Sequence, residues 1–366
     1  MCGPTTPDDV LVIQYTSGTT SFPKGVMNTH AQIVHNAKKF ATHMAIIPGD
    51  RHATAMPFFH NGGLVAGALC AMVNGACLVL ASRFQAESML EMLERHRCTS
   101  ISALDTMYIM MMGSEAFLRH DLSTVRTGVT TGVEIVRKIA HRMGIAGMLG
   151  LYGITEASPN VCLHFPDQPL EYRAVYAGRP HDGVEVCVKD PDTGARLATE
   201  ERGEICLRGF SVTRGYYNKP EETARAFDSE GWFHTGDVGR LTAAGDLRFE
   251  GRFKDIIRVG GENVAAIEIE DCLLTHPKVK QAYAVPAPHP TLIEVPAAYV
   301  VLAAGGTATI DELVQYVAGR LPRYKVPRLL RFLQESELPM TANGKVQKVK
   351  LKERVPTDFG VQEQVM

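Results

Sequence analysis

Short apolar segments alternate with amphipathic helical segments through the first part of the chain, and this alternation constrains the fold more than any other feature. Residues 85–96 place Met89, Leu90 and Leu93 on one face of a helix, and an apolar strand at 101–104 follows directly. Parallel sheets covered by helices are built from this pattern. We therefore predict an α/β fold with a doubly wound sheet. Further strands are expected at 11–15, 125–132, 148–152, 297–302 and 329–334. Helices are expected at about 265–275 and from Thr309, whose spacing to Glu312 fits a capping box.

The length of the chain and changes in its secondary-structure pattern indicate more than one domain. At 366 residues it is too long for one ordinary core. Between 175 and 250, short strands broken by glycine, proline and Asp-Gly turns predict a small distorted β-barrel. After Arg252 the pattern changes to a separate α+β unit. We therefore predict a large domain over residues 1–252 and a smaller, mobile C-terminal α+β domain over residues 253–366.

The charge balance excludes several classes of partner. Lysine and arginine number 38 against 40 acidic residues, and a net charge of −2 gives no field that would attract nucleic acid or anionic lipid. The 8 cysteines include no CxxC pair, which favours reduced structural thiols over a metal or redox site. The first residues lack the cationic start and apolar run of a secretory signal, so we expect a cytoplasmic enzyme.

One stretch, residues 62–81, is long and apolar enough to be read as a membrane span. It also contains Gly63 and Gly67 at the GxxxG spacing of membrane helix pairs. Asn74-Gly75, however, is a strong turn signal in its middle. We therefore favour a buried helix followed by a buried strand, and predict no membrane span.

A turn rich in hydrogen-bond donors follows the first expected strand. Residues 16–26 read TSGTTSFPKGV, and the hydroxyl and backbone N–H groups of such a turn can wrap phosphate oxygens, with Lys24 adding a positive charge. The segment lacks the GxxxxGK[ST] arrangement of a Walker loop. Taken alone, it would also fit a Ser/Thr-rich surface turn.

The same segment resembles the phosphate loop of the adenylate-forming superfamily, which includes acyl-CoA ligases, peptide-synthetase adenylation domains and luciferases. Further signatures of that superfamily occur here in its own order, which argues against chance. Within the superfamily, the sequence most resembles medium-chain fatty acyl-CoA ligases, because YGITEASP is followed by HFP at 164–166. The signatures are PFFHNGG (57–63), LYGITEASP (151–159), GEICLRGFSVTRGYYNKPEET (203–223), GWFHTGDVG (231–239), GRFKDIIRVGGENV (251–264) and PMTANGKVQK (339–348).

This resemblance implies a reaction in two steps. A carboxylic acid, by the resemblance a fatty acid, reacts with ATP to give an acyl adenylate and pyrophosphate, and coenzyme A then takes the acyl group as a thioester and releases AMP. Two unit charges about 4 Å apart in a partly buried site repel by about 4 kcal/mol, so a cation must neutralise the meeting of carboxylate and α-phosphate. Lys345, which follows the turn dipeptide Asn343-Gly344, matches the family lysine that bridges the two anions. Without the motif, Lys345 would be read as a solvated lysine of a charged strand.

The resemblance also assigns residues to the metal and the nucleoside. Glu156, beside Thr155, resembles the residue that holds Mg²⁺ against the phosphates, a task that suits a carboxylate oxygen. Tyr152 resembles the ring along the adenine face, with an aromatic residue at the end of a core strand as the alternative. Asp237 matches the aspartate that accepts from both ribose hydroxyls, and Arg252 its neighbour at the sugar, whereas Asp237 alone would be read as a turn residue. The nucleotide positions carried over with these are Thr16, Ser17, Gly18, Thr19, Thr20, Lys24, Gly132 and Gly153.

The remaining matches concern the second half-reaction and the acyl pocket. Lys254 matches the hinge about which the small domain rotates, and Gly260-Gly261 match the backbone along which the pantetheine arm of coenzyme A passes. A tight turn between a strand and a helix would explain the two glycines as well. His60 resembles the gate near the acyl pocket, and simple packing beside two phenylalanines is the alternative.

Three positions depart from the family pattern. Ser21 replaces a glycine of the phosphate loop but can still donate to phosphate. Val133 stands in the adenine-side segment 130–135, where small residues are commoner, and is expected to tighten the nucleotide pocket. Ile293 precedes Glu294 where a glycine is usual, which leaves the conformation of that loop open.

The start of the chain is a larger departure. Family members contain a long segment before the phosphate loop, with strands of the large domain and part of the acyl pocket, whereas about fifteen residues precede it here. We interpret the chain as an N-terminally shortened member, whose exposed sheet edge would need a partner chain, a homo-oligomer contact or a rearranged fold. Two alternatives therefore stay open: a binding module that holds nucleotide or acyl adenylate without turnover, and an enzyme that loads a separate carrier protein.

Overall fold

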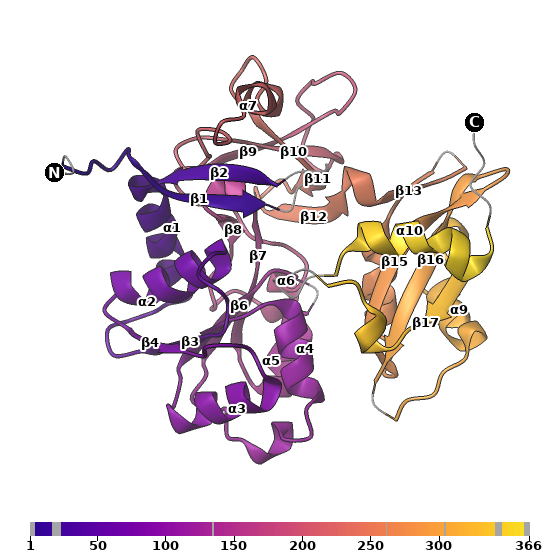
Figure 1. Ribbon diagram of the computed structural model, residues 1–366, viewed down its shortest axis with the longest axis horizontal. Helices are drawn as coiled ribbons and strands as arrows, with labels where there is room; N and C mark the ends of the chain where they lie inside the picture. The colour runs from indigo at the N-terminus through magenta and orange to yellow at the C-terminus, as the bar shows by residue number, and fades with distance from the viewer. Residues whose placement is uncertain are drawn as a thin grey trace. The chain divides into compact units, whose positions relative to one another are not determined.

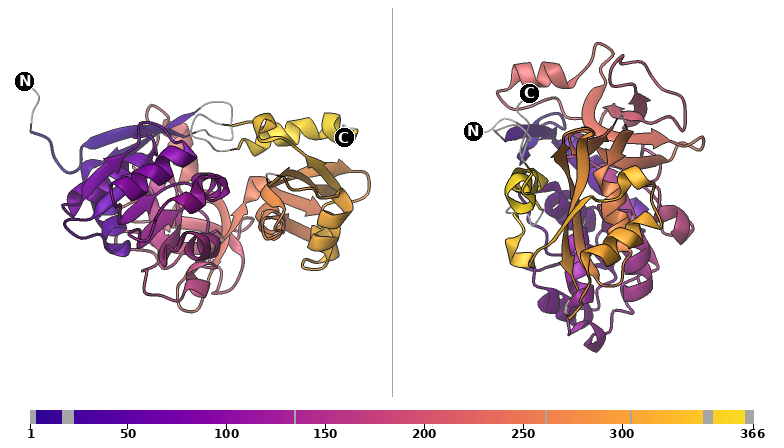
Figure 2. Two further views of the ribbon diagram at one scale, coloured as in Figure 1. Left: turned by 90° about the horizontal axis from the view of Figure 1, so that it is seen from below. Right: turned by 90° about the vertical axis from the view of Figure 1, so that its right-hand side faces the viewer.

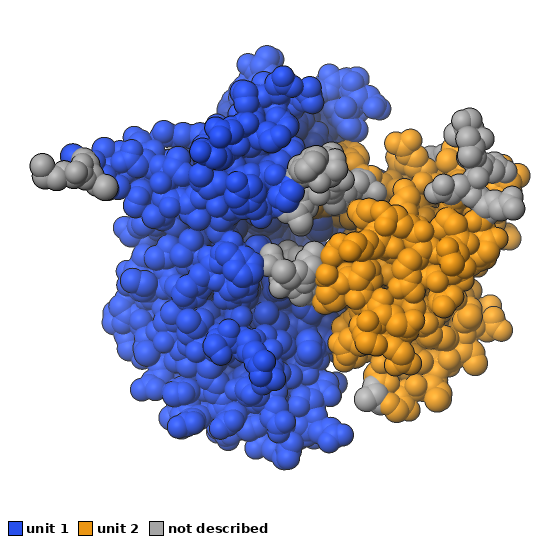
Figure 3. Space-filling view, in the orientation of Figure 1, with its two compact units in different colours: residues 1–235, 239–249 blue, residues 236–238, 250–366 orange. Residues whose placement is uncertain are grey.

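The computed structural model describes residues 4–16, 23–133, 135–260, 262–303, 305–340 and 346–361, and the Lys254 side chain is not described. The chain forms two compact units. The first comprises residues 1–235 and 239–249, and the second comprises residues 236–238 and 250–366 (Figure 3). Residues 236–238 thus belong to the second unit, residues 239–249 belong again to the first, and all residues from 250 onward belong to the second. The division into a large domain over residues 1–252 and a mobile C-terminal domain over residues 253–366 stays a prediction.

A 6-stranded sheet forms the centre of the first unit, with the strand order β4-β3-β5-β6-β7-β8 (Figure 1). Neighbouring strands from β4 to β7 are parallel, and β8 joins the edge antiparallel to β7. The predicted α/β class is therefore confirmed. The bounds are β3 Arg51–Thr54, β4 Cys77–Leu80, β5 Ser100–Ser102, β6 Thr127–Thr130, β7 Gly147–Gly153 and β8 Asn160–Leu163.

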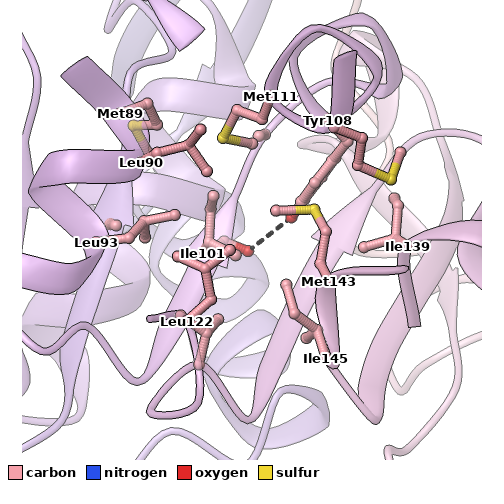
Figure 4. Packing of buried hydrophobic residues seen from close by; sticks show 14 of the residues in the cluster. Met89, Leu90, Leu93, Ile101, Tyr108, Met111, Leu122, Ile139, Met143 and Ile145 are labelled. Carbon is pink, nitrogen blue, oxygen red and sulfur yellow. Dashed lines mark hydrogen bonds between the residues drawn. The ribbon is translucent and has the colours of Figure 1, made fainter. Parts of the chain in front are cut away.

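Helices cover both faces of this sheet, as a doubly wound fold requires. Adjacent strand residues point to opposite faces, so Met148 packs into one core and Leu149 into the other. Figure 4 shows the first core, where Tyr108 donates a hydrogen bond to the carbonyl of Ile101 at 3.3 Å. The helices on that face are α3 Ala86–Arg95, α4 Asp105–Gly113 and α5 Val136–Met143; those on the other are α1 His30–His43, the π-helix η1 Gly62–Leu69 and α2 Cys70–Val73.

The apolar stretch at 62–81 forms the buried helix and strand that the Asn74-Gly75 turn predicts. The helical part ends at Val73, Gly75 has a φ of 66°, and strand β4 begins at Cys77. Within the part of the chain that the structure describes, no helix is both long and apolar enough to cross a membrane.

Two smaller sheets lie largely in the first unit, although residues 236–238 of β11 and 250–252 of β12 belong to the second. Strands β1 Val10–Thr16 and β2 Lys24–Thr29 pair antiparallel as a separate 2-stranded sheet. The outer side of β1 exposes apolar side chains, including Tyr15 at 67%, and the partner or homo-oligomer contact predicted at this edge stays a prediction. The other sheet has the order β12-β11-β10-β9, with β9 Glu185–Lys189, β10 Gly203–Arg208, β11 Phe233–Leu241 and β12 Leu247–Arg252, and the short helices α6 Leu170–Arg173 and α7 Pro220–Ala226 lie in the connecting segments.

The second unit is an α+β unit built on a 5-stranded sheet with the path β14-β13-β16-β15 and with β17 paired to β16. Alternation along β16 directs Ala298 and Val300 toward helices α8 and α9, and Tyr299 toward helix α10. Figure 2 shows these helices on opposite sides of the sheet. The bounds are β13 Ile256–Val259, β14 Glu262–Ala265, β15 Val279–His289, β16 Ile293–Leu302, β17 Leu329–Phe332, α8 Ala266–Leu274, α9 Ile310–Ala318 and α10 Lys348–Phe359.

Two sequence interpretations of this unit are resolved by the backbone. Gly260 lies between two paired strands, β13 and β14, so the alternative explanation by a turn between a strand and a helix is wrong. Ile293 adopts a φ of 67°, a left-handed conformation that a β-branched residue rarely takes. The glycine usual at this position in the family would adopt it without that cost.

His52 makes the first unit sensitive to acid. The ring lies fully buried in β3, where its nitrogens are 2.9 Å from the Ser100 hydroxyl and 2.9 Å from the Ala66 carbonyl. Burial lowers the pKa of His52 from 6.5 to about 4. Between these two pH values the unfolded chain binds a proton at His52 that the folded chain does not. The contribution of neutral His52 to the free energy of unfolding is therefore fully present above pH 6.5 and is lost as the pH falls toward 4.

We expect the free energy of unfolding to fall by about 1.4 kcal/mol per pH unit from this group, and by about 3 kcal/mol in all. Urea titrations from pH 7 to pH 4.5 would measure it. His52→Gln keeps a polar group at the site without the titration, and should flatten the slope by that amount. An unchanged slope in the variant would show that other groups cause the acid sensitivity.

Candidate active site

Polar residues gather where the parallel strands of the first unit end. His60 follows β3 and Asp105 follows β5, while the segments 130–132 and 152–156 begin in the last residues of β6 and β7 and continue beyond them. The carboxyl ends of neighbouring parallel strands meet at one edge of a sheet, where open α/β folds bind ligands. The residues that sequence patterns single out as separate motifs therefore lie along one edge.

The β1–β2 hairpin brings the predicted phosphate loop to this unit. Thr16 and Lys24 face each other in the last rung, and the Thr16 hydroxyl donates to the Lys24 carbonyl at 3.4 Å. The loop residues between them that were predicted to bind phosphate, Ser17, Gly18, Thr19 and Thr20, lie outside the described residues, as does Ser21. Their role stays a prediction.

Buried polar side chains fix the turn η3, Thr155–Ala157, which follows β7. The Asn28 amide in β2 donates to the Thr155 carbonyl at 3.1 Å, and the Asn36 amide in α1 donates to the Ala157 carbonyl at 3.2 Å. The backbone N–H of Thr213 donates to the Glu156 carbonyl at 2.6 Å. The hairpin, the first helix and a distant loop thus hold Thr155 and Glu156 in one place.

Glu156 forms a cluster with Tyr216 and Lys24. The Tyr216 hydroxyl donates to Oε1 of Glu156 at 3.0 Å, and the Lys24 ammonium lies 4.8 Å from the centre of the Tyr216 ring. Burial, together with the nearby Glu156 carboxylate, raises the pKa of Tyr216 well above its ordinary value. The tyrosine therefore remains a hydrogen-bond donor. Among the described residues, no hydrogen bond to the second oxygen of the partly buried Glu156 carboxylate is seen, so that oxygen is available to a ligand.

The segment after β6 wraps the carboxylate of Asp105. The hydroxyl of Thr130 donates to Oδ1 of Asp105, the Thr131 hydroxyl donates to Oδ2 at 2.9 Å, and the Gly132 N–H donates to Oδ1 at 3.0 Å. Val133 is buried, and a Cβ added to Gly150 in β7 would lie 2.6 Å from its Cα. This packing fixes the position of the adenine-side segment, and its contact with nucleotide stays a prediction.

Tyr152 and Gly153 end strand β7 under tight packing. The Tyr152 side chain is 5% exposed, belongs to a hydrophobic core cluster and stacks on Phe249 with ring centres 5.6 Å apart. A Cβ at Gly153 would lie 1.9 Å from the Pro159 carbonyl oxygen, so only glycine fits there. The structure thus shows the core packing of Tyr152, and its predicted stacking on adenine remains untested.

His60 stands at the start of the π-helix η1. Its Nδ1 accepts the Gly62 N–H at 3.0 Å, which leaves Nε2 as the protonated nitrogen of the neutral ring. Phe58 and Phe59 beside it are both exposed. Their exposure does not support the alternative in which His60 simply packs beside these two rings. A gating role at an acyl pocket stays a prediction.

In the second unit, Asp237 and Arg252 form an ion pair. Nε of Arg252 lies 2.9 Å from Oδ1 of Asp237, whose side chain is 2% exposed, while that of Arg252 is 46% exposed. Asp237 lies within strand β11, so the reading as a turn aspartate is wrong. A buried carboxylate oriented by a half-exposed guanidinium suits recognition of a diol, as predicted for ribose.

The other predicted residues of the second unit are partly described. Gly260 has a φ of 57°, which other residues rarely adopt, and a Cβ there would also displace Cδ2 of Leu292, 2.8 Å away, so this turn favours glycine. Lys254 lies in the short helix η4, Phe253–Asp255. Gly261 and Lys345 lie outside the described residues, although Met340 and Val346 on either side of Lys345 pair as an antiparallel bridge.

Comparison with known proteins decides the family. Residues 2–217 match the AMP-binding enzyme family, and residues 268–345 match the C-terminal domain of AMP-binding enzymes. The chain belongs to the AMP-binding enzyme family. The resemblance seen in the sequence motifs, and the two-part fold that it implies, are thereby confirmed.

Individual relatives of this AMP-binding enzyme are acyl-CoA ligases by name. The Bacillus subtilis (strain 168) protein YngI, provisionally named an acyl-CoA synthetase, is 37% identical over 358 residues, which cover 97% of this chain and 65% of YngI. The mitochondrial medium-chain acyl-CoA ligase of Danio rerio is 36% identical over 363 residues, covering 97% of this chain and 59% of the ligase. The chain therefore spans about 60 to 65% of the length of these relatives.

Solved structures of adenylate-forming enzymes share the fold. ATP-bound MatB from Rhodopseudomonas palustris matches with a TM-score of 0.86 and 28% identity, over 96% of this chain and 70% of MatB. The o-succinylbenzoate CoA synthetase of Bacillus subtilis, in complex with its acyl-adenylate intermediate, matches with a TM-score of 0.80 and 30% identity, over 95% of this chain and 70% of the synthetase.

Sequence reasoning missed three residues that organise the site of this AMP-binding enzyme. Tyr216 stands in the quoted GYYNKP signature, but nothing in its spacing indicates a hydrogen bond to Glu156. Asp105 directly follows a predicted strand, and its position at a strand end was a signal that could have identified it. Asn28 is a buried polar residue whose partner lies 127 positions away in the sequence.

Proposed function

We propose that this chain is an AMP-forming acyl-CoA ligase that activates a carboxylic acid, by its relatives a fatty acid, as an acyl adenylate and transfers it to coenzyme A. The observation that supports this most directly is the Lys24–Tyr216–Glu156 cluster beside the hairpin of the predicted phosphate loop. The family match and the acyl-CoA ligase names of the relatives support the choice of reaction.

The residues of the chain would divide the work as follows. The donor-rich loop and Lys24 would bind the phosphates, the Asp237–Arg252 pair would orient the ribose, and Lys345 would neutralise the meeting of carboxylate and α-phosphate. The segment at Gly260 and Gly261 would line the path of the thiol, with Lys254 as the hinge.

Glu156 fits the role of Mg²⁺ ligand. Hard cations of this kind bind carboxylate oxygens, and the Tyr216 hydrogen bond to Oε1 orients the carboxylate without neutralising it. When bound, the cation would neutralise phosphate charge. The chain's own contribution is to hold the carboxylate at the carboxyl end of β7, next to the hairpin.

The compartment and the partners belong to the same proposal. The described cysteines are free thiols, which suits the reducing conditions of the cytoplasm, where we place the protein. We propose no nucleic-acid partner, because the net charge of −2 provides no attraction to a polyanion. Coenzyme A is the proposed acceptor in place of a carrier protein, in line with the names of the relatives.

A panel of carboxylic acids would test the proposed function. Pyrophosphate release should require ATP, Mg²⁺ and a suitable acid, and AMP and thioester should accumulate once coenzyme A is added. We expect medium-chain fatty acids to react at least about tenfold faster than short ones, because each additional buried methylene contributes about 0.8 kcal/mol. Binding of ATP by calorimetry with no pyrophosphate from any acid would instead establish a binding module.

A further inference from the structure

Three neighbouring strands of the sheet β12-β11-β10-β9 bring together side chains that the proposed reaction does not use. Glu204 and Cys206 lie two residues apart on β10 and so point to the same face. His234 lies on β11, the next strand, and Cys187 on β9 pairs directly with Cys206. These residues come from three separate segments, so no short cysteine motif in the sequence indicates them.

The ligand atoms of this cluster are close together. Nδ1 of His234 lies 2.7 Å from Oε2 of Glu204 and 3.7 Å from Sγ of Cys206. One ligand atom from each of Glu204, Cys206 and His234 lies within 4.8 Å of the other two. In a tetrahedral zinc site, bonds of about 2.0 to 2.3 Å place neighbouring ligand atoms about 3.3 to 3.8 Å apart. Small side-chain adjustments would therefore suffice to coordinate one ion.

The surroundings of His234 match those of a metal-binding imidazole. Nδ1 now donates to Oε2 of Glu204, and an ion that replaced this proton would bind the Nδ1 lone pair. The proton would then lie on Nε2, where Oδ2 of Asp228, 3.5 Å away, can accept it. The Lys189 ammonium nearby is itself bound by Asp228 at 2.6 Å and by Glu230 at 2.8 Å, which offsets its repulsion of a cation.

The exposure of these side chains is compatible with a bound structural ion. Cys206 and Cys187 are fully buried and lie within hydrogen-bonding distance of each other. The Glu204 side chain is 13% exposed and that of His234 is 30% exposed, so an ion can reach the cluster from the His234 side. Imidazole, thiolate and carboxylate together form a donor set that suits Zn²⁺ and is unsuited to Mg²⁺.

We propose that Glu204, Cys206 and His234 bind one Zn²⁺ ion, with the Cys187 thiol or a water molecule as the fourth ligand. The ion would link β10 to β11, the strand in which Asp237 also lies. Its role is structural, since none of its ligands is among the residues assigned to nucleotide, acid or thiol. Coordination would hold β11 against β10 independently of backbone hydrogen bonds.

The single tryptophan of the chain provides a local reporter. Trp232 packs against Cys187 and Cys206, and the sequence contains 1 tryptophan, so intrinsic tryptophan fluorescence arises beside the proposed site. We would titrate the full chain, without nucleotide and with excess Mg²⁺ to occupy carboxylate sites, with Co²⁺ as a spectroscopic substitute for Zn²⁺. The expected result is one Co²⁺ per chain with a thiolate-to-cobalt charge-transfer band and quenched Trp232 fluorescence, both reversed by one equivalent of Zn²⁺.

Variants would separate this site from adventitious binding. Cys206→Ser and His234→Gln should each abolish the band, and Asp228→Asn should weaken binding by about 10-fold to 100-fold by releasing the imidazole. Cys77→Ser, which removes an exposed thiol elsewhere, should bind like the native chain. The proposal would be overturned if Cys206→Ser bound Co²⁺ as the native chain does, or if no band appeared in the native chain.

A second measurement needs no variant. Zn²⁺ should protect Cys187 and Cys206 from a thiol-alkylating reagent during partial unfolding in urea, while leaving Cys98, which lies in another core, unprotected. Equal alkylation of all three with and without Zn²⁺ would contradict the proposal. Since these readouts do not involve ATP or acid, they distinguish failure of the zinc site from failure of the proposed ligase activity.

Discussion

Replacing Glu156 with glutamine is expected to lower kcat/KM for pyrophosphate formation by at least ~10²-fold. The amide has nearly the same shape and can still accept the Tyr216 hydroxyl, so the turn after β7 should fold as before. It has no negative charge to hold a hard cation against the phosphates. The loss should be smaller at high Mg²⁺ concentration, and a titration of initial rate against Mg²⁺ should show a midpoint shifted to higher concentration.

Tyr216→Phe is the matched control for this prediction. It removes the hydroxyl that orients the Glu156 carboxylate but keeps the ring beneath the Lys24 ammonium. One hydrogen bond to a charged group contributes about 1.5 to 3 kcal/mol, so a loss of about 10-fold to 100-fold with some recovery in Mg²⁺ is expected. If Glu156→Gln retained the native Mg²⁺ dependence, Glu156 would not be the metal ligand.

The sequence predicted those parts of the fold that depend on local periodicity. Met89, Leu90 and Leu93 form the buried face of α3 because residues three and four apart share one side of a helix. The Thr309 hydroxyl accepts the Glu312 N–H at 3.1 Å, as the capping spacing predicts. Asn74-Gly75 ends a helix because Gly75 takes a positive φ at little cost.

The parts that sequence could not supply depend on contacts between distant segments. The hydrogen bond between Tyr216 and Glu156 joins positions 60 residues apart, and local patterns do not specify such a pair. The strand at 11–15 was predicted, but its antiparallel pairing with β2, apart from the main sheet, depends on register. The alternative of a turn between a strand and a helix at Gly260 overlooked β14, which is only 4 residues long.

The cysteine cluster also depends on contacts between segments that are separate in the sequence. Searching for CxxC spacing tests only neighbours in sequence, and it favoured structural thiols. Strand pairing places Cys187 opposite Cys206 although they lie 19 residues apart by number (206 minus 187). A site assembled across strands can therefore be recognised only after the register of the sheet is known.

Lys345→Ala is expected to slow adenylate formation by at least ~10²-fold, or about 2.7 kcal/mol in barrier height. This is less than the repulsion of about 4 kcal/mol between two unit charges about 4 Å apart in a partly buried site, because Mg²⁺ and the phosphate loop would still supply positive charge. Attack of coenzyme A on a preformed acyl adenylate should be largely unaffected, since that step no longer brings a carboxylate to a polyanion.

Single-turnover assays would separate the two half-reactions. Pyrophosphate release from ATP and acid measures the first, and thioester formation from a chemically prepared adenylate measures the second. Lys352→Ala is the matched control, because it removes the same charge from the exposed side of α10 in the same basic segment and should leave both rates unchanged. Equal loss of both half-reactions in Lys345→Ala would contradict the bridging role and would indicate that the lysine instead supports the structure of the C-terminal unit.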